Sequence, residues 1–339
     1  MKNYKIIFTA PKIAEVLQDD APTPNSDQVL VKTMCSTVSG GTERANLIGD
    51  ENLSWHDKPR EATYPRNTGY SSSGIIEAVG SNVKDYTVGD RVALSWCPHS
   101  RYCVADASKI HKIEDPSITF SEAALCHIGT FPLGAIRKCH LEIGESAIVM
   151  GLGILGILGV LQLKAAGAAP IIAVDPVKEK RELALKLGAD HAFDPFDKDF
   201  SDRVKSVTNG GVKVALEVTG NGTALDQVLD CMARFGRVAL LGCTRDSNFQ
   251  IDYYRKVHGP GIVLYGAHTM ARPDHESSSG LWTTHDDVMA QLKLLSLGRL
   301  NYRQIIDETH SPMDAPTVYT RLANENSFPV TQFDWSAVE

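Results

Sequence analysis

Three glycines in one short segment have the spacing of a turn that binds a dinucleotide. Gly151, Gly153 and Gly156 follow an apolar run and precede a helical pattern. The first glycine permits a tight turn, the second lets backbone N–H groups approach a pyrophosphate, and the third lets helix and strand pack closely. Because the N-terminus of that helix is positively polarised, we expect the backbone of Gly153, Ile154 and Leu155 to bind the pyrophosphate.

An acidic residue follows at the position that such a site requires. A second apolar run, 171–174, ends on Asp175, nineteen residues after Gly156. A carboxylate at the end of the second strand accepts hydrogen bonds from the adenosine ribose. It would also repel a 2′-phosphate, so the sequence favours NAD over NADP. Lys180 is a second candidate for the same ribose, with a solvated helix charge as the alternative interpretation.

The same segment has a competing interpretation as a membrane helix, because residues 147–163 carry no charge. A membrane span needs roughly 17–25 apolar residues, so this run is at the short end of that range. Four glycines also interrupt it. Since glycine costs about 1 kcal/mol in a helix interior, these residues indicate a turn and a packing face instead.

The elements that position these residues follow from the apolar periodicity. Before residue 115, short alternating runs separated by glycine and proline predict a β-rich domain. From about residue 120, strands alternate with helices, which predicts a doubly wound parallel sheet. The expected strands are 147–150, 171–174, a short segment near His191, 214–218, 237–242 and 262–267, and the expected helices are 178–187, 223–234 and 284–297.

The predicted division is a β-rich domain at 1–122 and 271–339 and a Rossmann domain at 123–270. The C-terminal tail has the pattern strand, helix, strand, and we expect it to rejoin the N-terminal domain. A length of 339 residues allows two separate cores.

Bulk composition narrows the class of function. With 43% hydrophobic and 22% charged residues, the chain has the composition of a soluble enzyme. A formal net charge of −7 and the lack of a basic stripe argue against nucleic acid or an anionic membrane as partner. The N-terminus has no signal-peptide pattern, and the odd number of cysteines, 7, is scattered along the chain. We therefore expect reduced thiols and a cytoplasmic location.

Four further motifs carry a resemblance to a known family. They are VKTMCSTVSGGTE (31–43), NTGYSSSGIIEAVG (67–80), GDRVALSW (89–96) and EVTGN (217–221). Together they resemble the medium-chain dehydrogenase/reductase superfamily, which includes the zinc alcohol and polyol dehydrogenases. The resemblance covers essentially the whole chain. It implies an α/β fold with a GroES-like β-rich catalytic domain and a Rossmann domain.

The chain departs from this family at the catalytic zinc. The family's ligands are a cysteine, a histidine and then a cysteine or glutamate. Here Ser39 and Tyr70 occupy the first two positions, Ser71 follows the second, and Cys126 or His127 occupies the third. Serine and tyrosine hydroxyls are not competent zinc ligands near neutral pH, so we expect no catalytic zinc.

The structural zinc lobe of the family also has no counterpart in the sequence. Cys97, His99 and Cys103 leave a partial metal site as an alternative interpretation. A closed tetrahedral site needs four ligands, and no fourth is nearby in the sequence. We therefore expect no metal.

Without zinc, other groups must polarise a carbonyl and move a proton. The resemblance places these candidates in the cleft between the domains: Ser39, Gly41, Thr42, Glu43, Tyr70, Trp96, Cys126, His127 and Thr130. Tyr70 can donate a hydrogen bond to a substrate oxygen, and Glu43 or His127 could act as general base. Trp96 and Cys126 are expected to line the substrate pocket.

Each candidate also has a purely structural interpretation. Tyr70 could fill the volume of the lost histidine and zinc, Glu43 could pair with Arg44, and His127 could be a satisfied helix residue.

The remaining cofactor candidates lie at strand C-terminal ends, where open parallel sheets bind ligands. They are Thr219, Gly220, Gly242, Tyr265 and Gly266, together with Thr130, which the resemblance places near the nicotinamide.

The leading hypothesis is a zinc-independent, NAD-dependent alcohol dehydrogenase/reductase of the medium-chain type. It would interconvert a secondary alcohol, such as a polyol or sugar derivative, and a ketone. The segments 39–44 and 69–74 are similar to zinc-less relatives of bacteriochlorophyllide hydroxyethyl dehydrogenases. The alternatives are a zinc-independent enone or quinone reductase, which would usually prefer NADPH, and a non-catalytic NAD-binding protein.

The expected partners are a small-molecule substrate and further copies of the chain. The family implies a homodimer or homotetramer, with the edge strand near 262–267 as the contact. An apolar edge strand left bare would invite uncontrolled pairing.

Overall fold

The computed structural model describes residues 1–53 and 58–338, in two units. Unit 1 comprises residues 1–128 and 288–339, and unit 2 comprises residues 129–287. Both boundaries are later than the expected 122/123 and 270/271. Helix α2 (Phe120–Ala123) belongs to unit 1 because it packs on the β-rich sheet. The segment 271–287 belongs to unit 2 because Arg272 donates hydrogen bonds to Thr130 and Asp287.

Unit 1 is built on two sheets. Its strands are β1 (Lys2–Ala10), β2 (Ile13–Asp20), β3 (Gln28–Thr37), β4 (Arg66–Asn67), β5 (Ser71–Val79), β6 (Arg91–Ser95), β7 (Tyr102–Asp106), β8 (Ile110–Lys112), β15 (Glu308–His310) and β16 (Thr331–Asp334). One sheet has the order β2-β1-β4, and the other has the order β15-β16-β3-β5-β6-β8, with β7 paired to β3. Strand β16 is antiparallel to β3, which confirms that the C-terminal tail rejoins the N-terminal domain.

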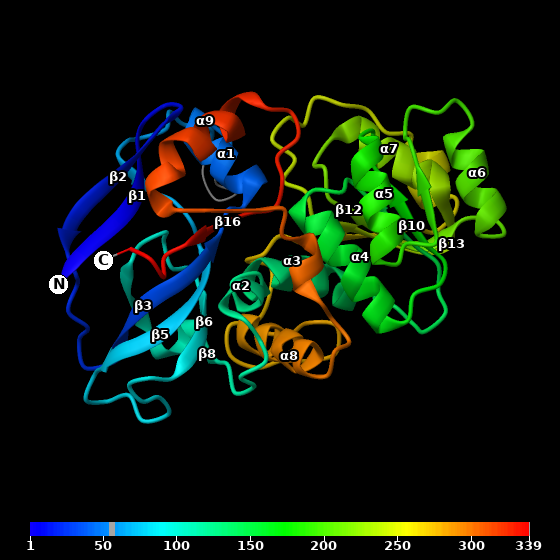
Figure 1. The fold of residues 1–339 in the computed structure, drawn as a ribbon. Coiled ribbons are helices and arrows are strands. Elements are labelled where there is room, and N and C mark those ends of the chain that lie inside the picture. Colours follow the sequence, from blue (N-terminus) through cyan, green and yellow to red (C-terminus); the bar gives the residue numbers. More distant parts are fainter. Residues whose placement is uncertain (54–57, 339) are drawn as a thin grey trace. The chain divides into compact units, whose positions relative to one another are not determined.

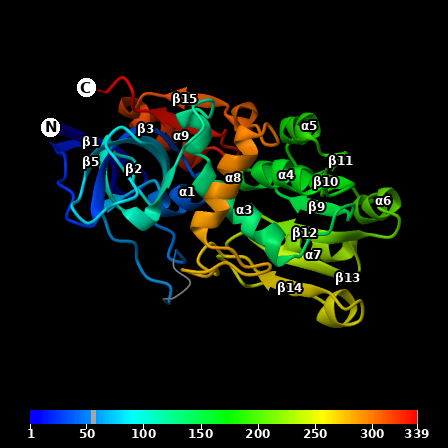
Figure 2. The ribbon, with the colours of Figure 1, turned by 90° about the horizontal axis from the view of Figure 1, so that it is seen from below.

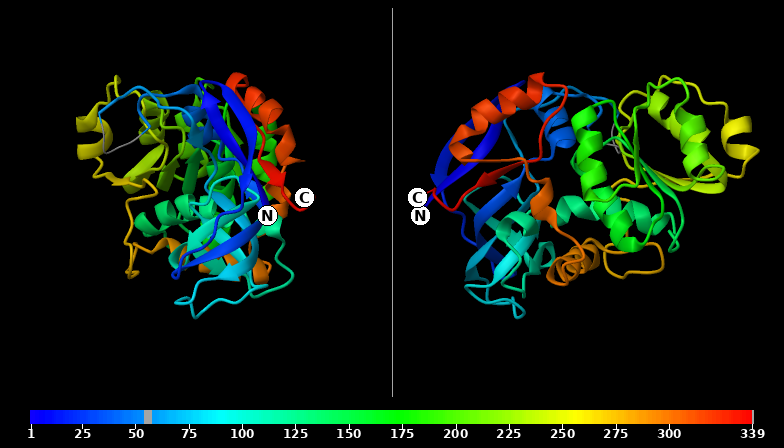
Figure 3. Two further views of the ribbon diagram at one scale, coloured as in Figure 1. Left: turned by 90° about the vertical axis from the view of Figure 1, so that its left-hand side faces the viewer. Right: turned by 45° about the vertical axis from the view of Figure 1, so that its right-hand side comes forward.

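Helices cover the β-rich core of unit 1. They are α1 (Gly40–Ile48), α2, α9 (Ala315–Asn324) and the larger part of α8 (Thr284–Ser296). Helix α9 packs against α1 and β2 (Figure 1). One core cluster includes Phe8, Leu47, Tyr319 and Trp335, so it joins β1, both helices and the end of the chain. Strand β1 and the segment after β16 therefore lie together, as every view in Figure 3 shows.

Unit 2 is a six-stranded parallel sheet. Its strands are β9 (Ala147–Met150), β10 (Ile171–Val174), β11 (His191–Phe193), β12 (Val212–Glu217), β13 (Met232–Leu240) and β14 (Val263–Gly266). They follow one another in the order β11-β10-β9-β12-β13-β14 (Figure 2). The order reverses between β9 and β12, and open sheets bind ligands at the carboxyl end of such a switch point.

Helices pack on both faces of this sheet. Helices α4 (Ile154–Ala166) and α5 (Lys178–Leu187) contact β9, β10 and β11. Helices α6 (Phe200–Val207) and α7 (Gly222–Cys231) contribute to one continuous apolar cluster with the sheet. Helix α3 (Cys126–Lys138) runs from unit 1 into unit 2. The doubly wound α/β fold expected from the sequence is confirmed.

The uncharged segment 147–163 divides into β9, a turn and the first part of α4, which excludes the membrane-helix alternative for it. Within residues 1–53 and 58–338, no helix is long and apolar enough to cross a membrane.

Candidate functional site

The predicted dinucleotide turn connects β9 to α4 in unit 2. Gly151 has a φ of 96°, which favours glycine, and a Cβ there would lie 2.8 Å from the side chain of Thr219. A Cβ on Gly156 would lie 1.9 Å from the carbonyl oxygen of Gly151, whereas a Cβ on Gly153 would meet nothing within 4 Å. Gly153 is also the N-cap of α4 and provides no side-chain cap. The first N–H groups of α4, including those of Ile154 and Leu155, therefore face an open approach, as a pyrophosphate site requires.

Asp175 lies directly after β10 and is only 6% exposed. One carboxylate oxygen accepts a hydrogen bond from Leu152 N at 2.8 Å, and the other accepts one from Val177 N at 2.9 Å. A carboxylate offers about four acceptor positions, so two remain for ribose hydroxyls. Asp175 thus fixes the turn after β9 and keeps acceptor positions for the predicted contacts with a ribose. Lys180 is in the first turn of α5, five residues further on.

The other predicted cofactor residues at strand ends also lie at the carboxyl edge of this sheet. Glu217, the last residue of β12, accepts hydrogen bonds from Thr219 N at 2.8 Å and from Gly220 N at 3.1 Å. A Cβ on Gly242 would lie 2.1 Å from Gly220 N, so the loops after β12 and β13 touch through glycines. Tyr265 and Gly266 end the edge strand β14. Burial raises the pKa of Glu217, and the hydrogen bonds from Thr219 and Gly220 only partly offset this effect.

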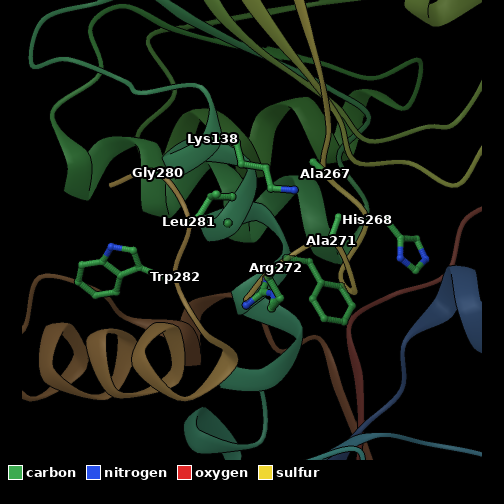
Figure 4. A pocket seen from close by; sticks show the side chains of 10 residues that line it. Lys138, Ala267, His268, Ala271, Arg272, Gly280, Leu281 and Trp282 are labelled. Atoms are coloured by element: carbon green, nitrogen blue, oxygen red, sulfur yellow. The ribbon is translucent and has the colours of Figure 1, made fainter. Parts of the chain in front are cut away.

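A small pocket lies beside the end of β14, within unit 2 (Figure 4). Lys138 lines it and donates to the carbonyl of Gly266 at 2.7 Å. Arg272 lines it as well and donates to the carbonyl of Thr130 at 2.9 Å. Burial, with the nearby charge of Arg272, lowers the pKa of Lys138. These two cations hold the backbone of two predicted cofactor residues. The sequence analysis missed both cations, because they lie outside any recognisable motif.

In unit 1, Ser39 and Tyr70 form a hydroxyl pair. Ser39 is the N-cap of α1, yet its side chain makes no capping hydrogen bond. Instead, the Tyr70 hydroxyl donates a hydrogen bond to Ser39 Oγ. The resemblance assigned these two residues to zinc-ligand positions, and the structure brings their oxygens into direct contact.

Two aromatic side chains adjoin Tyr70. The ring of His127 lies 5.7 Å from that of Tyr70 between centroids, edge-on, and the ring of Trp96 lies 4.6 Å from that of His127. Trp96 is 42% exposed and has a φ of 64°, a left-handed conformation that is rare for a bulky residue. The backbone N–H of Trp96 donates to the carbonyl of Tyr70 at 2.8 Å. This strained backbone turns the indole toward Tyr70 and His127, and such strain is concentrated at functional sites.

Glu43 is close to the hydroxyl pair but is almost fully buried, at 2% exposure. Its carboxylate accepts hydrogen bonds from Ser39 N at 2.7 Å, Thr68 Oγ1 at 2.8 Å and the Tyr319 hydroxyl, and it faces His99 Nε2 at 3.2 Å. Four donors fill the acceptor positions of a carboxylate.

Burial would raise the pKa of Glu43, but the charge of His99 and the hydrogen bonds it accepts lower it overall. The structure also places Thr42 beside Glu43 in the first turn of α1. Cys126 is fully buried, and burial raises the pKa of its thiol.

The donor set does not fit the zinc site of the family. Among the residues that the structure describes, no three His, Cys, Asp or Glu side chains are grouped so as to hold a metal ion. His99, part of the partial motif in the sequence, faces Ser36 Oγ at 2.7 Å on one side and Glu43 on the other. Cys97 and Cys103 are buried in an apolar cluster of the β-rich core.

Comparison with known proteins identifies the family. Residues 25–157 match the alcohol dehydrogenase GroES-like domain, and residues 155–278 match the zinc-binding dehydrogenase domain. The L-threonine 3-dehydrogenase of Thermococcus kodakarensis is 30% identical over 342 residues, which cover 92% of this chain and 92% of that protein. The D-guloside 3-dehydrogenase of Escherichia coli is 25% identical over 342 residues, which cover 95% and 96%.

A solved structure shares the fold. Galactitol-1-phosphate dehydrogenase from Escherichia coli superposes with a TM-score of 0.84 at 18% identity, covering 98% of this chain and 99% of that one. The fold and these matches support a two-domain oxidoreductase. The chain belongs to the zinc-type medium-chain dehydrogenase/reductase superfamily, as the sequence motifs predicted.

Proposed function

We propose that this protein oxidises a secondary alcohol to a ketone with NAD, and catalyses the reverse reaction, without a catalytic zinc ion. Its relatives are named as dehydrogenases, which supports the oxidoreductase class. The observation that carries the proposal is the hydroxyl pair of Tyr70 and Ser39, at two positions where the family binds zinc. A pair of hydroxyls can donate to a substrate oxygen, which is the task otherwise performed by the metal.

The chain's own residues hold the alcohol oxygen and move its proton. Ser39 Oγ and Tyr70 Oη bind the oxygen, and bound NAD supplies the hydride acceptor. We assign His127 as general base, because its ring adjoins that of Tyr70 and histidine is the side chain that most often performs this role. Glu43 is a poorer candidate than the sequence indicated, because four donors already engage its carboxylate.

Trp96 supports a polyol or sugar derivative as substrate. Its half-exposed indole presents a flat apolar face next to Tyr70 and His127. The C–H face of such a molecule can pack on an indole while its hydroxyls meet Ser39 and Tyr70. The names of the relatives, with threonine and a D-guloside as substrates, are consistent with small hydroxylated molecules.

NAD is the proposed cofactor, with NADP disfavoured. The open approach to Gly153 fits a pyrophosphate, and a 2′-phosphate would meet the charge of Asp175. Removal of that charge by Asp175→Asn should therefore lower the preference for NAD over NADP, measured as the ratio of kcat/KM values.

The test begins with metal analysis of protein purified without chelator or added zinc, together with NAD reduction on a panel of secondary alcohols and polyols. Turnover at a zinc content far below one ion per chain supports the proposal. Turnover that a chelator abolishes and zinc restores overturns the metal-free mechanism. Enone reduction with NADPH alone, or tight NAD binding with no turnover, would favour the reductase or the non-catalytic alternative.

Two tyrosine variants then test the hydroxyl pair. Tyr70→Phe should lower kcat about 10²-fold, the usual effect of removing one oxyanion donor. Tyr86→Phe is the matched control, because Tyr86 is also a partly buried donor in unit 1 but bonds the carbonyl of Ile110. Equal kcat values for the two variants would exclude Tyr70 from the chemistry.

We further propose a homodimer or homotetramer formed through the edge strand β14. This strand ends the sheet of unit 2, and Val263 on it is 43% exposed. Pairing with a second copy would cover the open edge of this strand.

A further inference from the structure

Two ionisable side chains with no direct role in the proposed chemistry adjoin the hydroxyl pair. Glu43 is 2% exposed and His99 is 0% exposed, and His99 Nε2 faces Glu43 Oε2 at 3.2 Å. The other ring nitrogen of His99 is 2.7 Å from Ser36 Oγ, which also accepts from Trp335 Nε1 at 2.8 Å. A buried charged group is expensive to retain unless its hydrogen bonds are complete, and here they are.

Glu43 holds Ser39 from inside helix α1. Its Oε1 accepts the N–H of Ser39 at 2.7 Å, reaching back across the first turn. A serine at an N-cap usually spends its hydroxyl on the N–H groups of the next turn. Because the carboxylate fixes the backbone at this position instead, the Ser39 hydroxyl is left to accept from Tyr70.

The same two side chains also hold the segment that carries Tyr70. Thr68 Oγ1 donates to Glu43 at 2.8 Å, and the N–H of His99 donates to the carbonyl of Thr68 at 2.8 Å. Gly69 has a φ of 84°, and a Cβ there would lie 2.5 Å from the His99 ring. The backbone of residues 68–69 therefore packs directly on the His99 ring, and this contact fixes the direction in which the chain continues to Tyr70.

We propose that Glu43 and His99 are a positioning pair that holds the hydroxyls of Ser39 and Tyr70 in one fixed arrangement. The expected effect on catalysis rests on the proposed function, whereas the effect on the arrangement of the two hydroxyls does not. Glu43 acts through Ser39 N and Thr68, and His99 acts through Glu43 and the close contact with Gly69. Neither side chain exchanges a proton with the substrate.

The test compares two buried glutamates of unit 1. Glu43→Gln keeps the shape but replaces an acceptor oxygen with an NH₂ group that opposes the surrounding donors. Glu122→Gln is the matched control, because Glu122 is 6% exposed and also reaches back to an N-cap N–H, that of Thr119, but its partners are Thr119 and Arg303. Thr68→Val is a milder second variant that removes one donor from Glu43.

Two measurements are made on each full-length variant. The first is the ¹³C resonance of the Tyr70 ring carbon that bears the hydroxyl, in protein labelled at that position and assigned with Tyr70→Phe. The second is kcat and KM on an alcohol that the wild type oxidises, with the Kd for NADH as a binding control.

Glu43→Gln should shift the Tyr70 resonance and lower kcat, by up to about 10²-fold if the pair moves by an ångström. The Kd for NADH should stay within about twofold. Glu122→Gln should change neither the Tyr70 resonance nor kcat. If Glu43→Gln does not fold, Thr68→Val must show the same resonance shift, and no shift in it overturns the proposal.

A Glu43→Gln protein that folds with wild-type resonance and kcat refutes the positioning role. If the wild type oxidises no alcohol, the proposed function fails, whereas the Tyr70 resonance still decides whether the pair positions the hydroxyls.

Discussion

Two glycines of the turn between β9 and α4, the proposed dinucleotide site, should respond differently to the same substitution. A Cβ at Gly156 would lie 1.9 Å from the carbonyl oxygen of Gly151, whereas ordinary contacts begin at 3.4 Å. Gly156→Ala therefore forces α4 and the turn apart by more than an ångström. A Cβ at Gly153 meets nothing within 4 Å, so Gly153→Ala leaves the fold without a clash.

The expected magnitudes follow from these two environments. Overpacking costs about 1–3 kcal/mol, and each kcal/mol lowers Tm by roughly 2–4 °C in a domain of this size. Gly156→Ala should therefore lose several degrees and also bind NAD less tightly, because the turn is displaced. Gly153→Ala should cost at most about 1 kcal/mol at an N-cap. Its methyl group covers the backbone that a pyrophosphate approaches, so Kd should rise tenfold or more, or about 1.4 kcal/mol.

The assay pairs calorimetric Tm with titration of NADH by fluorescence. The expected pattern is a loss of affinity with at most a small loss of Tm in Gly153→Ala, and a loss of affinity with a larger loss of Tm in Gly156→Ala. An unchanged Kd for Gly153→Ala would refute the assignment of the turn to the pyrophosphate. An unchanged Tm for Gly156→Ala would refute the close packing.

Three further predictions concern other sites. Asp287→Ala should destabilise unit 2 by about 3 kcal/mol in urea unfolding, because it leaves the partly buried Arg137 and Arg272 without their shared carboxylate; a loss below 1 kcal/mol would contradict this. Burial raises the pKa of Glu217 above its ordinary 4.5, so ionisation opposes folding, and Glu217→Gln should gain stability over the wild type as pH rises above 4.5 toward neutrality. A Tm difference that is independent of pH would speak against that sign. Val263→Asp should reduce the mass in light scattering to that of one chain, 36.9 kDa, and an unchanged mass would place the subunit contact elsewhere.

The Rossmann unit was largely predictable because its signals are local. The helix expected at 178–187 is α5 without change, and β9 and β10 have the expected bounds. Strand β13 begins at Met232 rather than at 237, because its first part pairs with Val212 before an irregularity in register. The π-helical turn Tyr254–His258 carries no periodic signal and was not expected.

The hydroxyl pair could be predicted from the sequence only in part. Ser39 and Tyr70 were identified because a family pattern fixes their positions, but nothing in the sequence shows that their oxygens meet. The hydrogen bonds to Glu43 could not be predicted from the sequence, since Glu43 and its partner Tyr319 are 276 residues apart. From the sequence, a partial metal site was only an alternative interpretation of His99, and in the fold its ring faces Glu43. Such contacts have no period along the chain.

At the start of α1, two roles that one N-cap residue usually combines are divided between two residues. Glu43 holds the start of the helix, and Ser39 presents the side chain at that position. At an ordinary N-cap, a change of side chain alters helix stability by about 1 kcal/mol, so selection for stability restricts the residue type. At position 39 the carboxylate of Glu43 secures the start of the helix. The side chain there is consequently free to change its chemistry while the scaffold stays the same. A hydroxyl, a thiol or a bare methyl group at residue 39 would begin the same helix, so this position can exchange one catalytic strategy for another at little structural expense.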